Sequence, residues 1–290
     1  MNRRRQIGEQ LIHAIFLILG LLTVGCVLLI TFYLLLAGLP ALRAIGFSRF
    51  FLSGKWTPLE SVPSYGILPF LLSSIYGTAG AVLLGVPTGF FTAVYLAKFA
   101  PKGMRVIIEG AVSLLAGIPS VVYGLVGMLV LVPAVRDLFR LPDGASLLSA
   151  ILVLGIMILP SVIKLSLTAL EAVPRDYEYA SLALGANAIE TCFRVSVPAA
   201  KSGIAAAITL GVGRALGEAM AVIMVSGNVA NMPSLFQSVR FLTTAVSSEM
   251  SYAVSGSLHQ QALFSIALVL FLFILLINAV LNFFLKRERN

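Results

Sequence analysis

The sequence predicts an all-α integral membrane protein with six transmembrane helices. The mean hydropathy is +1.01, and 59% of the 290 residues are hydrophobic whereas 11% are charged. Soluble domains carry about 25% charged residues. The chain also contains apolar stretches long enough to cross a hydrocarbon core about 30 Å thick, which takes roughly 20 residues of α-helix. These two observations exclude a soluble globular fold and predict a single membrane domain over residues 1–290.

Six apolar stretches follow one another along the chain. The first comes after three arginines and, at 27 residues, is too long for the 7 to 15 residue core of a signal peptide, so we expect an uncleaved helix. The fifth is interrupted by Arg214 and Glu218. The expected spans are residues 11–37, 67–97, 110–132, 147–169, 203–225 and 260–285.

The distribution of basic residues predicts the orientation in the membrane. Six spans place both termini on one side. Of the 20 Lys and Arg residues, thirteen fall in the terminal segments and in alternate connections, six fall in the other connections, and Arg214 lies within a span. Because cytoplasmic segments are enriched in Lys and Arg, both termini are predicted to be cytoplasmic. Membrane lipid then accounts for the net charge of +8, and nucleic acid is not an expected partner.

The chain lacks the residue patterns of an enzyme. No span carries a Ser, His and Asp arrangement or a pair of carboxylates, and no His, Cys and carboxylate cluster has the spacing of a metal site. There is also no Walker loop for ATP. We therefore expect no catalytic residue, no metal and no cofactor in this chain, with any ATP used by another subunit.

The charged pair in the fifth span is the main candidate for a functional site. Arg214 lies eleven residues from either end of that span, where a charge costs about 2.5 to 3.5 kcal/mol on insertion scales. At i and i+4, Arg214 and Glu218 would share one helix face. One interpretation is an internal ion pair. The other is a translocation site in which Arg214 binds an oxyanion and Glu218 accepts a hydrogen bond from an oxyanion that still carries a proton, which favours phosphate over sulfate.

Small residues and a proline are expected to shape the neighbouring helices. Gly213 and Gly217 form a small-x-x-x-small pair, which is typical of close helix packing. Pro119 lies within the third span, where its missing backbone donor has to be tolerated by packing or by a cavity.

A polar segment over residues 170–201 lies on the predicted cytoplasmic side. Loops of this length usually carry function, and the charged residues among Ala and Leu predict one or two short amphipathic helices. The stretch from Tyr179 to Gly185, followed by Val195 to Pro198, resembles the EAA loop of ATP-binding-cassette (ABC) importer permeases, which docks into a groove on the ATPase subunit. The family's Glu position holds Tyr179 here, and Glu178 precedes it. The resemblance implies a coupling role for Glu178, Tyr179, Ala180, Gly185, Val195 and Pro198.

A second motif is more specific. Residues 213–222, with the sequence GRALGEAMAV, are similar to the C-type permease subunit of phosphate-specific (Pst) importers, and residues 115–124 and 256–264 support the similarity. The A-type partner subunit has a related Arg-x-x-Gly-Glu segment with a different continuation. Family members often carry a Glu where this chain has Ser113, with Glu109 one turn earlier.

The resemblance implies the fold and the partners. It implies a type I ABC importer permease fold in the bacterial cytoplasmic (inner) membrane, and ATP-driven alternating access that translocates inorganic phosphate. The implied partners are a homologous second permease subunit, two ATP-binding-cassette ATPase subunits and an extracytoplasmic phosphate-binding protein. Two alternatives stay open: an ABC permease for sulfate, molybdate or another oxyanion, and a secondary transporter, which would need acids at mid-membrane beyond Glu218.

Overall fold

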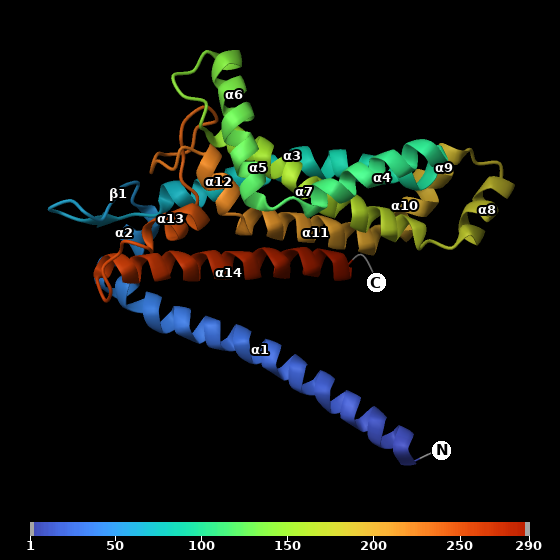
Figure 1. Ribbon diagram of the computed structural model, residues 1–290, viewed down its shortest axis with the longest axis horizontal. Helices are drawn as coiled ribbons and strands as arrows, with labels where there is room; N and C mark the ends of the chain where they lie inside the picture. Colours follow the sequence, from blue (N-terminus) through green and yellow to red (C-terminus); the bar gives the residue numbers. More distant parts are fainter. Residues whose placement is uncertain (1–2, 288–290) are drawn as a thin grey trace.

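A computed structural model of the protein describes residues 3–287, with side chains for all of these except residues 3–8, 10, 11, 281, 282 and 284–287. Arg289, one of the basic residues used to predict the orientation, lies outside the described part. The structure consists mainly of helices, and its two strands form one short antiparallel hairpin, in which Trp56 is opposite Tyr65 (Figure 1). In chain order the elements are α1 (Arg3–Ile45), α2 (Phe47–Leu52), β1 (Trp56–Thr57), β2 (Ser64–Tyr65), α3 (Leu68–Lys98), α4 (Lys102–Gly117), α5 (Ser120–Val126), the π-helical segment η1 (Gly127–Leu131), α6 (Val132–Phe139), α7 (Leu147–Glu171), α8 (Arg175–Ala183), α9 (Ala188–Thr191), the π-helical segment η2 (Cys192–Ser196), α10 (Val197–Ala199), α11 (Lys201–Gly217), α12 (Met220–Val225), α13 (Leu242–Glu249) and α14 (Leu258–Arg287).

Five helical runs in the described part are long and apolar enough to cross a membrane. They are α1, α3, the run from α5 to α6, α7 and α14. A sixth candidate is the pair formed by Ala188–Ala199 and α11, whose axes are bent by 71°. The protein is therefore a multi-pass integral membrane protein, as the hydropathy predicted.

Two of the expected spans are not continuous helices. The span expected over residues 110–132 is divided at Pro119, where α4 has ended and α5 begins, because a proline disfavours the helical conformation of the residue before it. The span expected over residues 203–225 is divided after Gly217, where Glu218 has extended backbone. Pro119 is therefore a helix boundary and does not lie inside a packed span.

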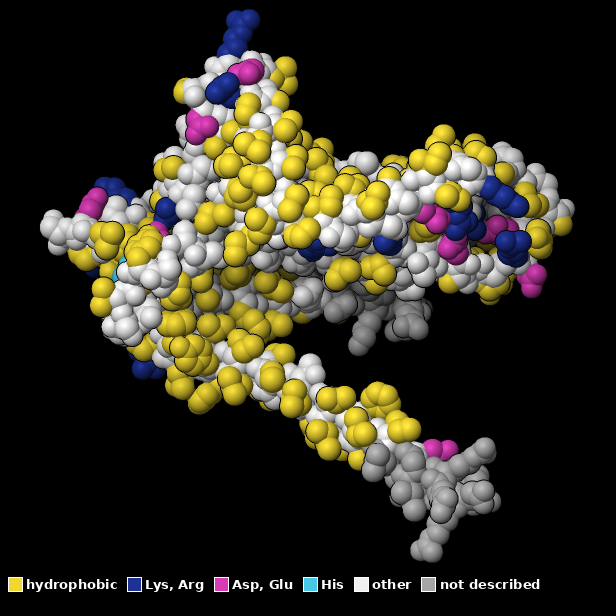
Figure 2. All heavy atoms as spheres, viewed as in Figure 1, with side chains coloured by type: hydrophobic (Ala, Val, Ile, Leu, Met, Phe, Trp, Pro, Cys, Tyr) yellow, Lys and Arg dark blue, Asp and Glu magenta, His cyan; other side chains and the backbone are white. Residues whose placement is uncertain are grey.

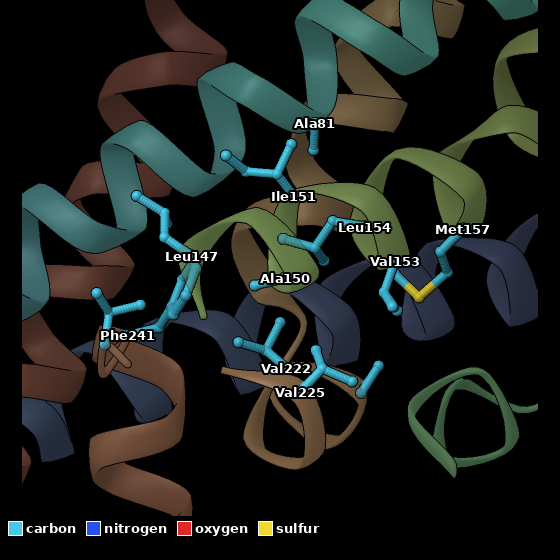
Figure 3. Close-up of a cluster of buried hydrophobic side chains, with 12 residues drawn as sticks. Ala81, Leu147, Ala150, Ile151, Val153, Leu154, Met157, Val222, Val225 and Phe241 are labelled. Carbon is cyan, nitrogen blue, oxygen red and sulfur yellow. The ribbon is translucent and has the colours of Figure 1, made fainter. Parts of the chain in front are cut away.

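The most extensive helix contact joins α3 to α7. It depends on glycines of α3, because a Cβ on Gly85 would lie 2.7 Å from the Ile158 side chain and 2.8 Å from the carbonyl oxygen of Gly155. The buried cluster in Figure 3 continues this contact toward α12 and α13, with Ile151 and Leu154 of α7 at its centre. The close approach of α3 and α7 makes them one rigid unit, since interiors of this density yield little.

Helix α1 stands away from the bundle along most of its length (Figure 1). Its contact with α14 is near its end, where Ser265 Oγ donates to the Gly38 carbonyl at 2.6 Å and Tyr33 packs edge-on against Phe264. The most apolar part of α1 is exposed and covered with hydrophobic side chains (Figure 2). Such a surface suits acyl chains or a neighbouring subunit.

The two ends of the molecule differ. The start of α1 and the end of α14 point toward the same end as α8 and α9, whereas the hairpin, α6 and α13 lie at the other end (Figure 1). This agrees with the prediction that both termini lie on the side of residues 170–201. Acidic and basic side chains gather around α8 at this end (Figure 2).

Substituting Gly85 by alanine is expected to lower the stability of the protein. The added Cβ meets a backbone carbonyl that cannot rotate away, so we expect a loss of about 1 to 3 kcal/mol, typical of an overpacked core. Gly25→Ala in α1 is the matched control, because a Cβ there has no atom within 4 Å. Thermal unfolding of the detergent-solubilised protein measures both, and equal melting temperatures for the two variants would show that the α3 and α7 contact is not tight.

Candidate functional site

The break after Gly217 separates the two charged residues of the candidate site. Arg214 lies in the last turn of α11, whereas Glu218 follows the helix end with φ −74° and ψ 125°. The expected shared helix face is therefore wrong, because the helix does not continue through Glu218. Among the described residues no ion pair joins Arg214 to Glu218, so the ion-pair interpretation does not hold for this conformation.

Arg214 faces a cleft between three helices. Its Nη1 donates a hydrogen bond to Ser161 Oγ of α7 at 3.3 Å. The cleft has a volume of about 510 Å³, which is large enough for a small oxyanion and several waters. Its lining comes from α7, α11 and α14, and consists of Ser161, Ala206, Thr209, Leu210, Gly213, Arg214 and Asn278.

Glu218 does not line this cleft, and its carboxylate and carbonyl groups form hydrogen bonds at the break between α11 and α12. Its Oε1 accepts a hydrogen bond from the backbone N–H of Ala221 at 3.0 Å. Its carbonyl oxygen accepts one from Thr243 Oγ1 of α13 at 2.9 Å. Inside a membrane such groups need internal partners, so Glu218 holds the start of α12 and links it to α13.

The two glycines beside Arg214 do not pack helices of this chain together. A Cβ on either Gly213 or Gly217 would meet no atom within 4 Å. The packing predicted from their spacing is therefore wrong within the chain. Gly213 instead lines the cleft, whereas Gly203 and Gly211 are the glycines of α11 that approach α7: a Cβ on Gly203 would lie 2.4 Å from the Ala169 side chain.

Ser113 and Glu109 lie at a different site. They line a separate cleft of about 180 Å³ together with Lys164, and neither lines the Arg214 cleft. Glu109 also accepts a hydrogen bond from Arg105 Nε at 2.6 Å. The Ser at position 113 therefore removes no carboxylate from the surroundings of Arg214.

The segment expected over residues 170–201 forms short helices, as its pattern predicted. Helix α7 extends to Glu171, and α8, α9, η2 and α10 follow. Gly185 comes after α8 with φ +91°, a conformation that favours glycine. Glu178, Tyr179 and Ala180 lie in α8, Val195 lies in η2 and Pro198 lies in α10.

Apolar side chains of this segment face away from the protein. Leu184 is 91% exposed, and Tyr177, Tyr179, Leu182 and Ile189 are exposed as well. Exposed apolar residues gathered on one element are typical of a docking surface for another protein. The structure thus places Tyr179 on the outer side of α8, where a partner can reach it.

Glu178 points the other way and ties α8 to the membrane helices. Its carboxylate forms an ion pair with Lys98 at the end of α3 and accepts a hydrogen bond from Ser196 Oγ at 2.9 Å. Burial opposes ionisation of this carboxyl, but the Lys98 and Ser196 hydrogen bonds and the Lys98 charge outweigh it, so the pKa of Glu178 lies below its ordinary value. A second link nearby is the ion pair from Arg105 to Glu171 at the end of α7.

A buried polar cluster at the opposite end was missed by the sequence analysis. Glu249, at the end of α13, is 3% exposed, and its carboxylate accepts hydrogen bonds from Trp56 Nε1 at 3.0 and 3.1 Å. It also pairs with Arg240 and lies 2.8 Å from His259 Nε2. Arg240 donates to the carbonyl of Asn228 as well. The sequence signal that could have indicated this cluster is the presence of Arg240 and Glu249 in an otherwise uncharged segment between α12 and α14.

Comparison with known families supports the architecture. Residues 85–290 match the family of binding-protein-dependent transport system inner membrane components. The chain is 37% identical over 284 residues to the probable ABC transporter permease protein YqgH of Bacillus subtilis, covering 96% of this chain and 92% of that protein. It is 33% identical over 267 residues to the phosphate transport system permease protein PstC of Mesorhizobium japonicum, covering 85% of this chain and 80% of that protein. The probable phosphate transport system permease protein PstC of Methanocaldococcus jannaschii is 31% identical over 283 residues, covering 91% of this chain and 89% of that protein.

Solved structures share the fold. A chain of the MetNI methionine ABC transporter in an inward-facing conformation superposes with a TM-score of 0.60 at 18% identity, covering 74% of this chain and 93% of that chain. A chain of a bacterial alginate ABC transporter, in complex with an alginate pentasaccharide-bound periplasmic protein, superposes with a TM-score of 0.63 at 16% identity, covering 96% of both chains. These structures establish the type I importer permease fold.

Glu178→Gln is expected to destabilise the protein in a pH-dependent way. Because the pKa of Glu178 is lowered in the folded state, its ion pair stabilises the fold above the ordinary carboxyl pKa and is lost as the pH falls through the lowered value. At neutral pH we expect a loss of about 1 to 2 kcal/mol. Melting temperatures measured from neutral to acidic pH should converge with those of the parent. A constant difference across this range, or an equal loss for the exposed control Glu60→Gln, would contradict the assignment.

Glu249→Gln is expected to be more damaging, because it leaves Arg240 beside a neutral group in a buried site. Breaking a buried ion pair costs about 3 to 5 kcal/mol. Replacing both residues, as Arg240→Met with Glu249→Gln, should cost less than the sum of the single changes. Thermal unfolding of the single and double variants tests this coupling, and additive losses would mean that the two side chains act independently.

Proposed function

Because the chain belongs to the family of binding-protein-dependent transport system inner membrane components, we propose that it forms one half of an ATP-driven importer for inorganic phosphate. The chain is a permease of an ABC importer. Phosphate as the cargo is supported by two features: the similarity to PstC proteins from several organisms, and the arginine in the cleft between α7, α11 and α14.

The cleft at Arg214 is the feature that carries the proposal. A guanidinium offers five donors in a planar arrangement that matches an oxyanion, and the surrounding low dielectric strengthens the attraction. One donor is used for Ser161. The remaining donors have no partner among the described residues, so they are available to an anion that passes the cleft.

The two ends of the molecule suit the partners of the proposed importer. At the end bearing α8 and α9, the exposed apolar side chains would meet one of two ATPase subunits, which hydrolyse the ATP. The other half of the channel is a homologous permease subunit. An extracytoplasmic phosphate-binding protein would deliver the anion at the end bearing the hairpin and α13. The assembly would reside in the bacterial cytoplasmic membrane.

In the proposed mechanism, this chain binds and releases the anion without chemical change. Closure of the ATPase subunits would move α8, and the ion pair of Glu178 with Lys98 would transmit that movement to α3, while the ion pair of Arg105 with Glu171 couples α4 to α7. Rearrangement of α7 against α11 would then change which side of the membrane reaches Arg214. Alternating access follows, driven by ATP that this chain does not itself bind.

Uptake of labelled phosphate by cells that lack this gene tests the proposal. The parent chain should restore uptake in the presence of excess sulfate, and Arg214→Ala should reduce it by roughly 10- to 100-fold, as expected for losing a charged hydrogen-bond donor. The control Arg136→Ala removes an exposed arginine and should leave uptake unchanged.

Co-purification of the ATPase subunits with each variant shows that the complex is assembled. An assembled parent complex that restores sulfate or molybdate uptake, but not phosphate uptake, would identify the cargo as another oxyanion. Normal phosphate uptake by Arg214→Ala would remove Arg214 from the pathway.

A further inference from the structure

The cleft beside Arg214 contains hydrogen-bond acceptors as well as donors. Thr209 precedes Arg214 on α11 and lines the same cleft. Its Oγ1 donates its only hydrogen to the carbonyl oxygen of Ala205, one turn back, at 2.9 Å. A hydroxyl that donates to the backbone in this way has only lone pairs left for other partners. Toward the cleft, Thr209 is therefore an acceptor.

Two further polar side chains complete the lining. Asn278 of α14 is half-buried and makes no hydrogen bond to the described residues, so its amide can both donate and accept. Ser161 accepts a hydrogen bond from Arg214, which leaves its own hydroxyl hydrogen to donate. The cleft thus offers donors from Arg214, Ser161 and Asn278, and uncharged acceptors from Thr209 and Asn278.

This combination fits an oxyanion that still carries a proton. At neutral pH inorganic phosphate carries at least one proton, whereas sulfate carries none. The bare oxygens of either anion can accept from Arg214 and Ser161, but only a protonated oxygen can donate to Thr209. A sulfate oxygen in the same position would place lone pair against lone pair. Neutral acceptors also avoid the charge repulsion that a carboxylate would impose on an anion.

We propose that Thr209 and Asn278 are the specificity-determining residues of this anion site, and that they select a protonated oxyanion over sulfate by accepting its hydrogen bond. The inference rests on the proposed function and assigns the selectivity within it. It replaces the role predicted for Glu218, whose carboxylate is bound to the backbone of Ala221 outside the cleft.

The test is equilibrium binding of radiolabelled phosphate and of radiolabelled sulfate at neutral pH. The sample is the purified complex of this chain with its permease partner and ATPase subunits, without the extracytoplasmic binding protein, so that the receptor's own selectivity does not enter. Thr209→Val removes the hydroxyl while keeping the shape of the side chain. Thr209→Ser is the matched control because it keeps the acceptor. Asn278→Leu is a second, independent variant on a different helix.

We expect Thr209→Val to weaken phosphate binding about tenfold, because one hydrogen bond is lost at a partly buried site. Sulfate binding should be unchanged or tighter, because sulfate has no proton to donate to Thr209. Thr209→Ser should bind both anions as the parent does, and Asn278→Leu should again reduce the preference for phosphate. Equal weakening of both anions would mean that these residues only shape the cleft, and unchanged phosphate binding in both Thr209→Val and Asn278→Leu would also overturn the proposal.

Two measurements with the parent chain, uptake by cells and binding by the receptor-free complex, distinguish a failure of this inference from a failure of the proposed function. If cells take up phosphate through the parent chain, but the receptor-free complex shows no preference for phosphate over sulfate, the selectivity lies elsewhere and only the present inference fails. If the parent chain does not restore phosphate uptake at all, the proposed function fails, and this inference fails with it.

Discussion

The structure depends on how the backbone is satisfied where a membrane helix is interrupted. In a hydrocarbon environment an unpaired N–H or C=O group costs several kcal/mol, so an interruption persists only where other groups supply the missing partners. After α11, the Glu218 carboxylate accepts a hydrogen bond from the Ala221 N–H, and the Thr243 hydroxyl donates one to the Glu218 carbonyl. At the end of α4, the Tyr123 hydroxyl donates to the carbonyl of Leu115 at 2.8 Å. Because these partners are fixed, Arg214 is held at the end of a helix, beside a cleft, and not in the middle of a continuous span.

The two interruptions lie against each other, and this explains why both can exist. Helix α5 packs on α12 so closely that a Cβ on Gly124 would lie 2.8 Å from the Cα of Ala221. Thr243, which binds Glu218, lies in the first turn of the short helix α13, and Glu249 ends that helix within the buried cluster of Trp56, Arg240 and His259. A single short helix therefore links the outer hairpin to the backbone beside Arg214. A displacement of the hairpin would reach Glu218 through α13, since residues near both ends of that helix are hydrogen-bonded.

Hydropathy and charge predicted the helical class, the approximate spans and the placement of both termini at the same end as residues 170–201, because these properties depend on composition over about 20 residues. The interruptions at Pro119 and Glu218 were not predicted. The residues that flank each one are apolar, so hydropathy averaged over about 20 residues stays high across the break. The small-x-x-x-small pair at Gly213 was misleading for a related reason: the spacing shows that close approach is sterically possible, but not which neighbour is present. Glu249 was missed because Trp56, which donates to its carboxylate, lies 193 residues away in the sequence, and the spacings of nine and ten residues to Arg240 and His259 exceed the three or four residues at which side chains meet on one helix.

The links at the α8 end connect the Arg214 cleft to the segment over residues 170–201. Glu178 of α8 is paired with Lys98 of α3, and Glu171 of α7 is paired with Arg105 of α4. Helices α3 and α7 cannot slide freely past each other, because Gly85 brings their backbones into contact. The same α7 carries Ser161, which accepts the hydrogen bond from Arg214. A displacement of α8 would therefore pass through the ion pair of Glu178 with Lys98 to a rigid pair of helices, and it would reach the proposed anion site as a change in the position of Ser161 relative to α11. Since Thr209 and Arg214 are both on α11, such a change would separate one donor from the rest of the site, which is a physical means of releasing an anion that was bound by all of them.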